Sequence, residues 1–293
     1  MKNKLSLFAV PYVGWMSIFV VAPIIIMVVY AFSTAAGDFT LENFARMGTY
    51  TAVFTRSFKL AIIATLIALL IGYPVSYMLS KEGPQVQRIA MVLIMLPMWM
   101  NFLLRTYSWM SILENNGLLN QLFQQIGLID LYNQIAMHFA SDPAAYVPID
   151  HFQMIGTQGA VVLGMVYNYL PFMILPIYSV LVKLDHSLIE AARDLGASSV
   201  QVFRKVILPL SLPGVLSGIT MVFIPSVSTF AISRLLGGGT HMMLGDLIEQ
   251  QFLGGAYNPQ LGAAIALVMM AIVVVCMLVM NRFGDGEEQA VML

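Results

Sequence analysis

Charge is scarce in this sequence, because only 10% of its 293 residues are Asp, Glu, Lys or Arg. Soluble domains carry about 25%. With 59% hydrophobic residues and a mean hydropathy of +0.83, the composition excludes a water-soluble globule. The net charge is −1 and no long basic block occurs. Nucleic acid is therefore excluded as a partner, since binding phosphates needs clustered Lys and Arg.

Catalytic and metal-binding patterns are also missing. The single cysteine, Cys276, lies in an apolar run, which excludes a disulfide framework. The sequence contains no GxxxxGK[ST], HExxH, GxSxG or paired CxxC pattern. No Asp or Glu lies deep in an apolar run, where ion-coupled carriers usually need one. We therefore predict no enzyme, no catalytic residue, no metal site and no cofactor, and any energy input must come from a partner.

Methionine is abundant, with 22 residues. Met91, Met95, Met98 and Met100 share one apolar run, and thioethers could line a pathway for a soft metal ion. Adaptable packing is the favoured interpretation, because no Cys or His joins them.

Apolar runs of about 20 residues, long enough to cross a bilayer as helices, occur six times. We predict transmembrane helices at 7–32, 60–80, 89–112, 159–182, 212–234 and 261–281. The first is too long for the apolar part of a signal peptide and is expected to remain as a membrane helix. Prolines inside several runs could kink a pathway-lining bundle or only shape its packing, and the sequence leaves both open. They are Pro23, Pro97, Pro171, Pro176 and Pro225.

Basic residues predict the orientation, because cytoplasmic loops are enriched in Lys and Arg. With both termini inside, nine of the fourteen basic residues fall on the inner side, and the outer loop 114–158 has none. Arg105 and Arg234 lie near the outer ends of the third and fifth runs and are expected to snorkel outward. The nine are Lys2, Lys4, Lys81, Arg88, Lys183, Arg193, Arg204, Lys205 and Arg282.

The inner loop 183–211 predicts two short helices. Ser187 with Glu190 matches a capping box, so a helix should begin at Leu188 and stop at Gly196. Ser198 with Gln201 repeats the box, and this second helix should end near Pro209.

An apolar stripe marks the first of these helices. Leu188, Ala191, Ala192 and Leu195 follow the i, i+3, i+4, i+7 spacing. Such a stripe suits docking against a partner, but it equally suits an interfacial helix that covers the end of the bundle.

The same loop carries a recognisable signature. Its residues follow the pattern EAA-x3-G-x9-V-x-LP, formed by Glu190, Ala191, Ala192, Gly196, Val206, Leu208 and Pro209. This pattern resembles the signature of permease subunits of binding-protein-dependent ATP-binding-cassette (ABC) importers, with Val206 where the family usually has isoleucine. The resemblance implies that Glu190, Ala191, Ala192, Gly196, Leu208 and Pro209 form a coupling segment that docks in a groove of a cytoplasmic ATPase.

Further runs resemble the spermidine/putrescine subgroup, and most closely the first of its two permease subunits. They are 40–44 (TLENF), 72–75 (GYPV), 105–109 (RTYSW), 170–172 (LPF) and 190–198 (EAARDLGAS). The resemblance implies a polyamine-binding protein outside the membrane, a second homologous permease and two ATPase subunits that bind ATP and Mg.

Acids and aromatic rings suit a polyamine pathway, because ammonium groups bind carboxylates and aromatic faces. An interfacial aromatic belt and solvated loop acids explain the same residues singly. Arg234 weakens a polycation cargo unless Asp246 or Glu249 pairs with it. The candidate pathway residues are Tyr107, Trp109, Glu114, Tyr167, Tyr169, Asp246 and Glu249.

We therefore predict an all-α integral membrane protein with six transmembrane helices and the fold of a type I ABC importer permease. Residues 1–293 should form one permease domain with its core at about 58–281, a cytoplasmic coupling segment at 183–211 and an extracytoplasmic loop at 113–158. The loop should contain short amphipathic helices, since Leu118, Leu119, Leu122, Ile126 and Ile129 recur at roughly helical spacing.

The predicted function is that of a permease subunit in the bacterial inner membrane that forms half of a pathway for spermidine or putrescine. The alternative is the same importer type carrying an aminophosphonate, thiamine or ferric iron. An intramembrane enzyme would need a reactive constellation inside the spans, and a simple channel would not need the coupling segment.

Overall fold

The computed structural model describes residues 11–139 and 146–291, without the side chains of residue 281 and residues 283–291. Lys2, Lys4 and residues 7–10 of the first expected span lie outside this part. The described chain is helical, and its only paired extended backbone is an isolated antiparallel bridge between Ser33 and Phe39. The elements are η1 (Ser17–Val21), α2 (Ala22–Ala31), α3 (Glu42–Arg46), η2 (Met47–Tyr50), α4 (Thr51–Ser80), α5 (Pro84–Trp99), α6 (Phe102–Leu113), α7 (Leu118–Gln125), α8 (Leu128–Phe139), α9 (Gln158–Leu181), α10 (His186–Asp194), α11 (Ser199–Val202), η4 (Phe203–Ile207), α12 (Leu208–Ser228), α13 (Ala231–Leu236), α14 (Leu244–Leu253) and α15 (Pro259–Val291).

In the described part, five helices are long and apolar enough to cross a membrane, and a bent pair raises the number to as many as six. This confirms the predicted all-helical membrane protein. The fourth and sixth expected spans agree closely with α9 and with the apolar part of α15. The five helices are Pro11–Ala31, Glu42–Ser80, Gln158–Leu181, Ser199–Ser228 and Pro259–Met280.

The third expected span, 89–112, was wrong as a single helix. The chain bends by 90° between Pro84–Trp99 and Phe102–Gln125. Met100 has an extended ψ of 149°, and the Asn101 side chain accepts hydrogen bonds from the amides of Leu103 and Leu104. An asparagine N-cap thus starts a new helix where hydropathy alone shows one continuous run.

The fifth expected span, 212–234, was also wrong at both ends. Helix α12 ends at Ser228 because Thr229 is extended, and α13 then begins at Ala231. At the other end the helix continues back through Pro209 to Ser199. Pro209 lies in the first turn of α12, after the π-helix η4, in which the amide of Leu208 bonds to the carbonyl of Phe203. The wider π turn accommodates the proline without ending the helix, whereas we expected Pro209 to stop it.

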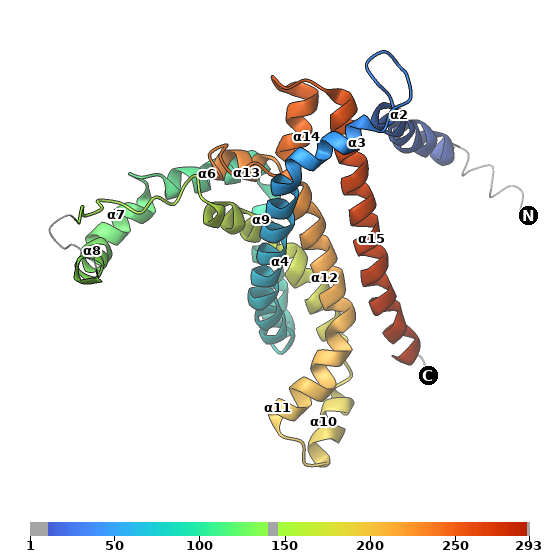
Figure 1. Cartoon of the computed structure of the whole chain (residues 1–293). Helices are drawn as coiled ribbons and strands as arrows, with labels where there is room; N and C mark the ends of the chain where they lie inside the picture. The colour runs from blue at the N-terminus through green and yellow to red at the C-terminus, as the bar shows by residue number, and fades with distance from the viewer. Residues whose placement is uncertain (1–10, 140–145, 292–293) are drawn as a thin grey trace, which may run out of the picture.

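Helices α4, α9 and α12 form the centre of the bundle (Figure 1). Small residues on one face of α4 let α9 approach closely: a Cβ on Gly72 would lie 2.9 Å from Met173 Cγ. Ser76 Oγ donates to the carbonyl of Ile174 at 3.1 Å, and Tyr73 and Ser211 share a hydrogen bond of 2.9 Å. These contacts join all three helices. Small residues and interhelical hydrogen bonds are the usual means by which transmembrane helices associate.

Replacing Gly214 by alanine is expected to weaken the contact between α12 and α9. A Cβ there would lie 2.8 Å from the carbonyl oxygen of Pro176 and 3.0 Å from Ile177 Cα, and backbone atoms cannot move aside cheaply. Overpacking of this kind costs about 1–3 kcal/mol. The measurement is the melting temperature of the purified protein in detergent. Gly83→Ala is the matched control, because nothing lies within 4 Å of the added methyl, and an equal loss in both variants would contradict the prediction.

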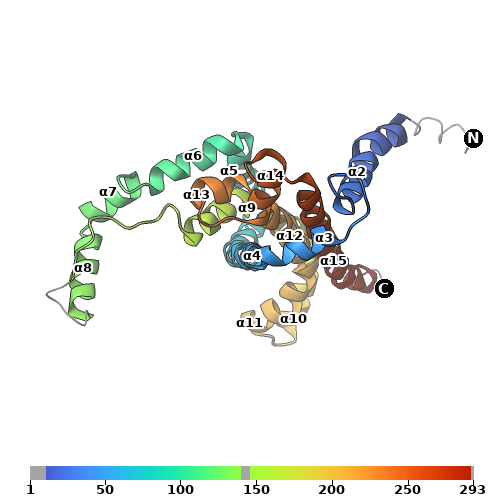
Figure 2. The same ribbon diagram turned by 45° about the horizontal axis from the view of Figure 1, so that its top comes forward.

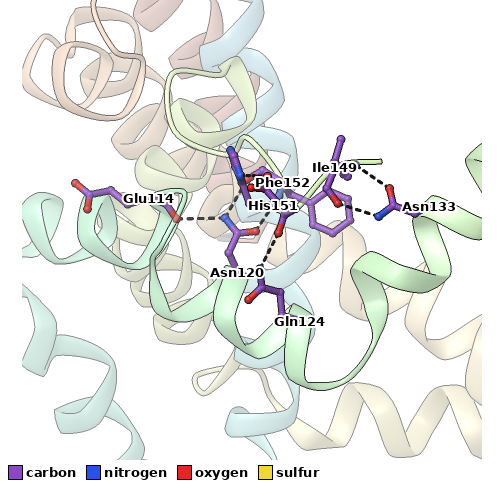
Figure 3. Close-up of polar contacts among 8 residues, drawn as sticks. Glu114, Asn120, Gln124, Asn133, Ile149, His151 and Phe152 are labelled. Carbon is purple, nitrogen blue, oxygen red and sulfur yellow. Dashed lines mark hydrogen bonds and ion pairs between the residues drawn. The ribbon is translucent and has the colours of Figure 1, made fainter. Parts of the chain in front are cut away.

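An arm, residues 114–139 and 146–152 with α7 and α8, extends away from the bundle in both views (Figures 1 and 2). The two helices confirm the short helices expected from the leucine and isoleucine spacing. Two asparagines join the arm's outgoing helices to its returning segment (Figure 3). Asn133 bonds to both backbone groups of Ile149, at 2.8 and 3.0 Å, and Asn120 bonds to both of Phe152, at 3.0 and 2.9 Å. Hydrogen bonds from these two side-chain amides therefore hold the two halves of the arm together.

Candidate coupling segment and translocation pathway

Helix α10 ends in a Schellman motif. The amide of Gly196 donates to the carbonyl of Arg193 at 2.8 Å, and the amide of Ala197 donates to that of Ala192 at 3.1 Å. Gly196 has a φ of +79°, the left-handed conformation that glycine adopts without strain. The predicted stop at Gly196 is confirmed.

The start of α10 differs from the prediction. Asp185, with an extended ψ of 118°, is the N-cap, and its side chain accepts a hydrogen bond of 2.9 Å from the amide of Ser187. The Ser187–Glu190 capping box was therefore wrong, and the helix begins two residues earlier than expected. The exposed carboxylate of Asp185 has a lowered pKa, mainly because of this backbone hydrogen bond.

The second capping box is confirmed. The amide of Ser198 donates to Gln201 Oε1 at 2.8 Å, and the amide of Gln201 donates to Ser198 Oγ at 3.4 Å. Phe203 then lies edge-on to Tyr73 and Tyr77, with ring centroids 5.9 and 5.5 Å away. The candidate coupling segment is thereby attached to the end of α4.

The two faces of α10 have different surroundings. Ile189 and Ala192 pack toward the core formed by α4, α9 and η4. Leu188 is 47% exposed and Leu195 is 89% exposed, and Ala191 is also exposed. The expected four-residue stripe is therefore divided, because Ala192 faces inward.

The signature residues do not all share one surface. Glu190 and Ala191 lie exposed on α10 and Gly196 ends that helix, whereas Leu208 and Pro209 lie beyond η4 at the start of α12. Only the first group can belong to the free face of α10.

Three of the candidate pathway aromatics lie near one another. The rings of Trp109 and Tyr167 meet edge-on with centroids 5.3 Å apart. Tyr169, on the same helix as Tyr167, packs with Trp109 in one apolar cluster and donates to the carbonyl of Pro225 at 3.5 Å. Tyr107 is 46% exposed on α6.

The candidate acids are held differently. Glu249 binds Arg234 at 3.0 Å, so the arginine is paired as the polyamine interpretation required. Asp246 is buried at the start of α14, where it accepts hydrogen bonds from Ser233 Oγ and from the amide of Met243. The side chain of Glu114 is exposed. Asp246 thus has a structural role that its sequence position did not indicate.

Arg105 corrects another expectation. It was expected to snorkel outward, but it is only 8% exposed, and its Nε and Nη1 atoms are buried without a hydrogen-bond partner. Asn168 is also buried; its Nδ2 donates to the carbonyl of Gly164 at 2.8 Å, and its Oδ1 has no partner. The sequence analysis did not single out Asn168, although an amide in the middle of an apolar run is the signal that could have found it.

Comparison with known proteins places this architecture in a family. Residues 64–286 match the family described as "Binding-protein-dependent transport system inner membrane component". This chain belongs to that family. The resemblance found in the coupling signature is confirmed.

Full-length relatives of this permease are similar over nearly their whole length. It is 35% identical over 281 residues to the "Spermidine/putrescine transport system permease protein PotB" of Escherichia coli (strain K12), covering 93% of this chain and 95% of the relative. The protein of the same name from Haemophilus influenzae is 35% identical over 285 residues, covering 93% of each.

Solved structures show the same fold. One chain of a bacterial ABC transporter involved in the import of alginate superposes with a TM-score of 0.76 over 97% of this permease and 96% of that chain, at 16% identity. A chain of the MetNI methionine ABC transporter gives a TM-score of 0.57 over 83% and 97%, at 18% identity.

The permease is therefore a non-catalytic, multi-pass subunit of an inner-membrane ABC importer that works with a binding protein and an ATPase. Permeases of this family bind no cofactor, and ATP is hydrolysed by their ATPase partners. Within the described residues, no group of three or more His, Cys, Asp or Glu could hold a metal ion.

The buried carboxyl of Asp246 leads to a prediction about pH. Burial raises the pKa of Asp246 above its ordinary value of 3.8, and the hydrogen bonds from Ser233 and Met243 offset only part of this. The folded permease then binds the proton more tightly than the unfolded chain, so this group's contribution to stability falls as pH rises from about 3.8 through the raised pKa. Asp246→Asn is expected to remove that fall. Melting temperatures in detergent across this range test it, and parallel curves for both proteins would contradict it.

Proposed function

We propose that this permease forms half of the translocation pathway for spermidine and putrescine, and that α10 transmits ATPase closure to the spans. The observation that supports it most is α10 itself, at the far end of the bundle from α14 (Figure 1). One face of α10 packs on the core, while Leu188, Ala191 and Leu195 are left uncovered. Because one side of α10 is packed and the other is free, a displacement of a partner docked on the free side would be transmitted to α4 and α12.

The proposed orientation places α10 and both termini in the cytoplasm. The Lys and Arg bias of the loops supports this, since Lys81, Arg88, Lys183 and Arg193 flank the same end of the bundle as α10. Helix α15 runs from the α14 end toward this end (Figure 1).

The proposed complex contains a second homologous permease, two cytoplasmic ATPase subunits and an extracytoplasmic polyamine-binding protein. We place the coupling function on Glu190, Ala191, Ala192 and Gly196, with Leu208 and Pro209 at the junction to α12. We propose one permease domain with its core at about 58–281 and an extracytoplasmic loop at 113–158, the bounds predicted from the sequence.

A polyamine cargo is supported by the similarity to permeases named for spermidine and putrescine. The pairing of Arg234 with Glu249 removes the main electrostatic objection, because a neutralised arginine does not repel an ammonium group. Trp109, Tyr167 and Tyr169 supply aromatic faces for cation–π contacts. Glu114 and Tyr107 are exposed and remain available to contact the cargo. Asp246 is buried, so we leave it out of the residues proposed to contact the cargo.

One observation favours a different cargo for the same type of importer. Arg105, on the same helix as Trp109, keeps two buried nitrogens without partners. An anionic or zwitterionic solute such as an aminophosphonate would suit a free guanidinium better than a polycation would.

The test is uptake of labelled spermidine, putrescine and an aminophosphonate into vesicles that contain this permease with its co-purified subunits and binding protein, with and without ATP. ATP-dependent polyamine uptake would support both the ATP-driven importer and its polyamine cargo. Uptake of the aminophosphonate alone would support the importer and reject polyamines as its cargo. No ATP-dependent uptake of any solute would reject the proposed cargoes.

A further inference from the structure

A hollow of about 220 Å³ lies where the bundle meets the coupling segment. Its walls come from the last turn of α4, the end of α9, helix α10 and the α11–η4 region. Five apolar side chains line it, together with Tyr77, two serines and three basic residues. The lining is Tyr77, Ser80, Lys81, Leu181, Leu184, His186, Ile189, Arg193, Ser199, Val202 and Ile207.

The charged side chains of this lining, Lys81 and Arg193, are both positive. They face the hollow together with the imidazole of His186, and no Asp or Glu does. Lys81 Nζ lies 3.9 Å from the centre of the Tyr77 ring, which holds the ammonium at the wall. Among the described side chains, neither Lys81 nor Arg193 forms an ion pair. The acids nearest along the chain, Glu82, Asp185, Glu190 and Asp194, are exposed outside the lining.

The hollow lies at the level expected for the surface of a bilayer. Ser80 is the last residue of one membrane-crossing helix and Leu181 is the last of another, and both line the hollow. Phospholipid headgroups lie at this level, and basic pockets between transmembrane helices on the cytoplasmic side bind them. The apolar part of the lining suits the glycerol and first acyl carbons that follow a headgroup.

We propose that this hollow binds a phosphate-bearing anion, the phosphodiester headgroup of an anionic phospholipid. Its binding would join α10 to the end of α4, because His186 and Arg193 lie on α10 whereas Lys81 follows α4. A bound headgroup would thus stiffen the coupling helix against the spans. The binding site goes beyond the proposed function, and only this mechanical consequence rests on it.

The test uses the full chain in nanodiscs of zwitterionic phosphatidylcholine that contain increasing phosphatidylglycerol. Native mass spectrometry counts the anionic lipid that remains bound, and dialysis against labelled inorganic phosphate in phosphatidylcholine alone tests a soluble source. Lys81→Gln with Arg193→Gln is expected to weaken phosphatidylglycerol binding roughly 25-fold, since each cation that faces the bound headgroup contributes about a fivefold factor.

Two further double variants make the result specific. Arg88→Gln with Lys183→Gln removes two exposed basic residues from the same end of the bundle but outside the lining, and it should retain the lipid. Lys81→Arg with Arg193→Lys keeps both charges and should also retain it. Circular dichroism and elution volume confirm that each variant is folded.

The outcomes separate the possibilities without ATPase or cargo, so they do not depend on the proposed function. Saturable phosphate binding that needs Lys81 and Arg193, with no preference for phosphatidylglycerol, would replace the lipid by a free phosphate. Equal lipid retention by wild type and the Lys81/Arg193 glutamine variant, or equal loss in the Arg88/Lys183 control, would overturn the proposal. So would the absence of any bound lipid or phosphate.

Discussion

Replacing Glu190 by lysine is expected to abolish ATP-dependent uptake while the permease remains folded in the membrane. Glu190 is exposed on α10, and within the described chain it has no hydrogen bond or ion pair whose loss would destabilise the fold. In the proposed complex this side chain faces the ATPase. Leaving a charge unpaired in a closed interface costs about 2–5 kcal/mol, a loss of roughly thirtyfold or more in productive coupling.

The measurement is cargo uptake by vesicles that contain the complete importer, together with the amount of permease in the membrane fraction. Glu82→Lys is the matched control, since Glu82 is an exposed acid at the same end of the bundle but outside the coupling segment. Wild-type uptake by Glu190→Lys would reject α10 as the coupling helix and favour an ungated channel.

Gly196→Asp is a companion change with a different mechanism. A Cβ at Gly196 meets nothing within 4 Å, so the substitution creates no clash, but the φ of +79° strains any L-residue. Such strain costs on the order of 1 kcal/mol or more and disturbs the end of α10 rather than its face. Uptake should fall while membrane insertion is retained. Gly196→Asn should lose less, because asparagine is the usual alternative to glycine at this position and adds no negative charge to the helix C-terminus.

Replacing Asn120 by alanine is expected to melt the arm and spare the bundle. The Asn120 side chain is 1% exposed and makes hydrogen bonds to the carbonyls of Glu114 and Phe152 and to the amide of Phe152, at 3.2, 3.0 and 2.9 Å. Figure 3 shows it between the outgoing helix and the returning segment. At about 1 kcal/mol for each hydrogen bond, the arm loses roughly 3 kcal/mol.

Hydrogen–deuterium exchange of the detergent-solubilised permease measures this effect. Amides of 146–152 should exchange much faster in Asn120→Ala, whereas those of α9 and α12 should not change. Gln121→Ala removes an exposed amide that makes one hydrogen bond, to the carbonyl of Asn116, and should have little effect. Faster exchange throughout the chain would show instead that the arm and the bundle unfold together.

Local interactions explain which features could be predicted from the sequence. Helix α9 lies within one residue of its predicted bounds because a long apolar run must cross the bilayer as a helix with every backbone group satisfied. The stop at Gly196 and the box of Ser198 with Gln201 are set within a few residues of chain. The coupling signature, also local, was sufficient to identify the family.

Competition between neighbouring signals defeated other predictions. Asp185 and Ser187 can both cap a helix, and Asp185 caps α10 because its backbone is extended there. Hydropathy cannot detect the turn at Met100 and Asn101, since the residues on both sides are equally apolar. Pro209 was expected to end a helix, but a π turn before it supplies the space that its ring needs.

The sequence by itself determined that this chain is an all-helical membrane permease that carries the family's signature, because hydropathy, turn chemistry and that signature are local properties. Only the tertiary structure decided which side chains meet. Arg234 is neutralised by Glu249, fifteen positions away. Asp246 is buried at the start of α14, Arg105 is buried on α6, a helix that contacts α9 and α13, and Lys81 and Arg193 share a hollow. These pairings depend on how separate helices pack, and no spacing along one helix encodes them.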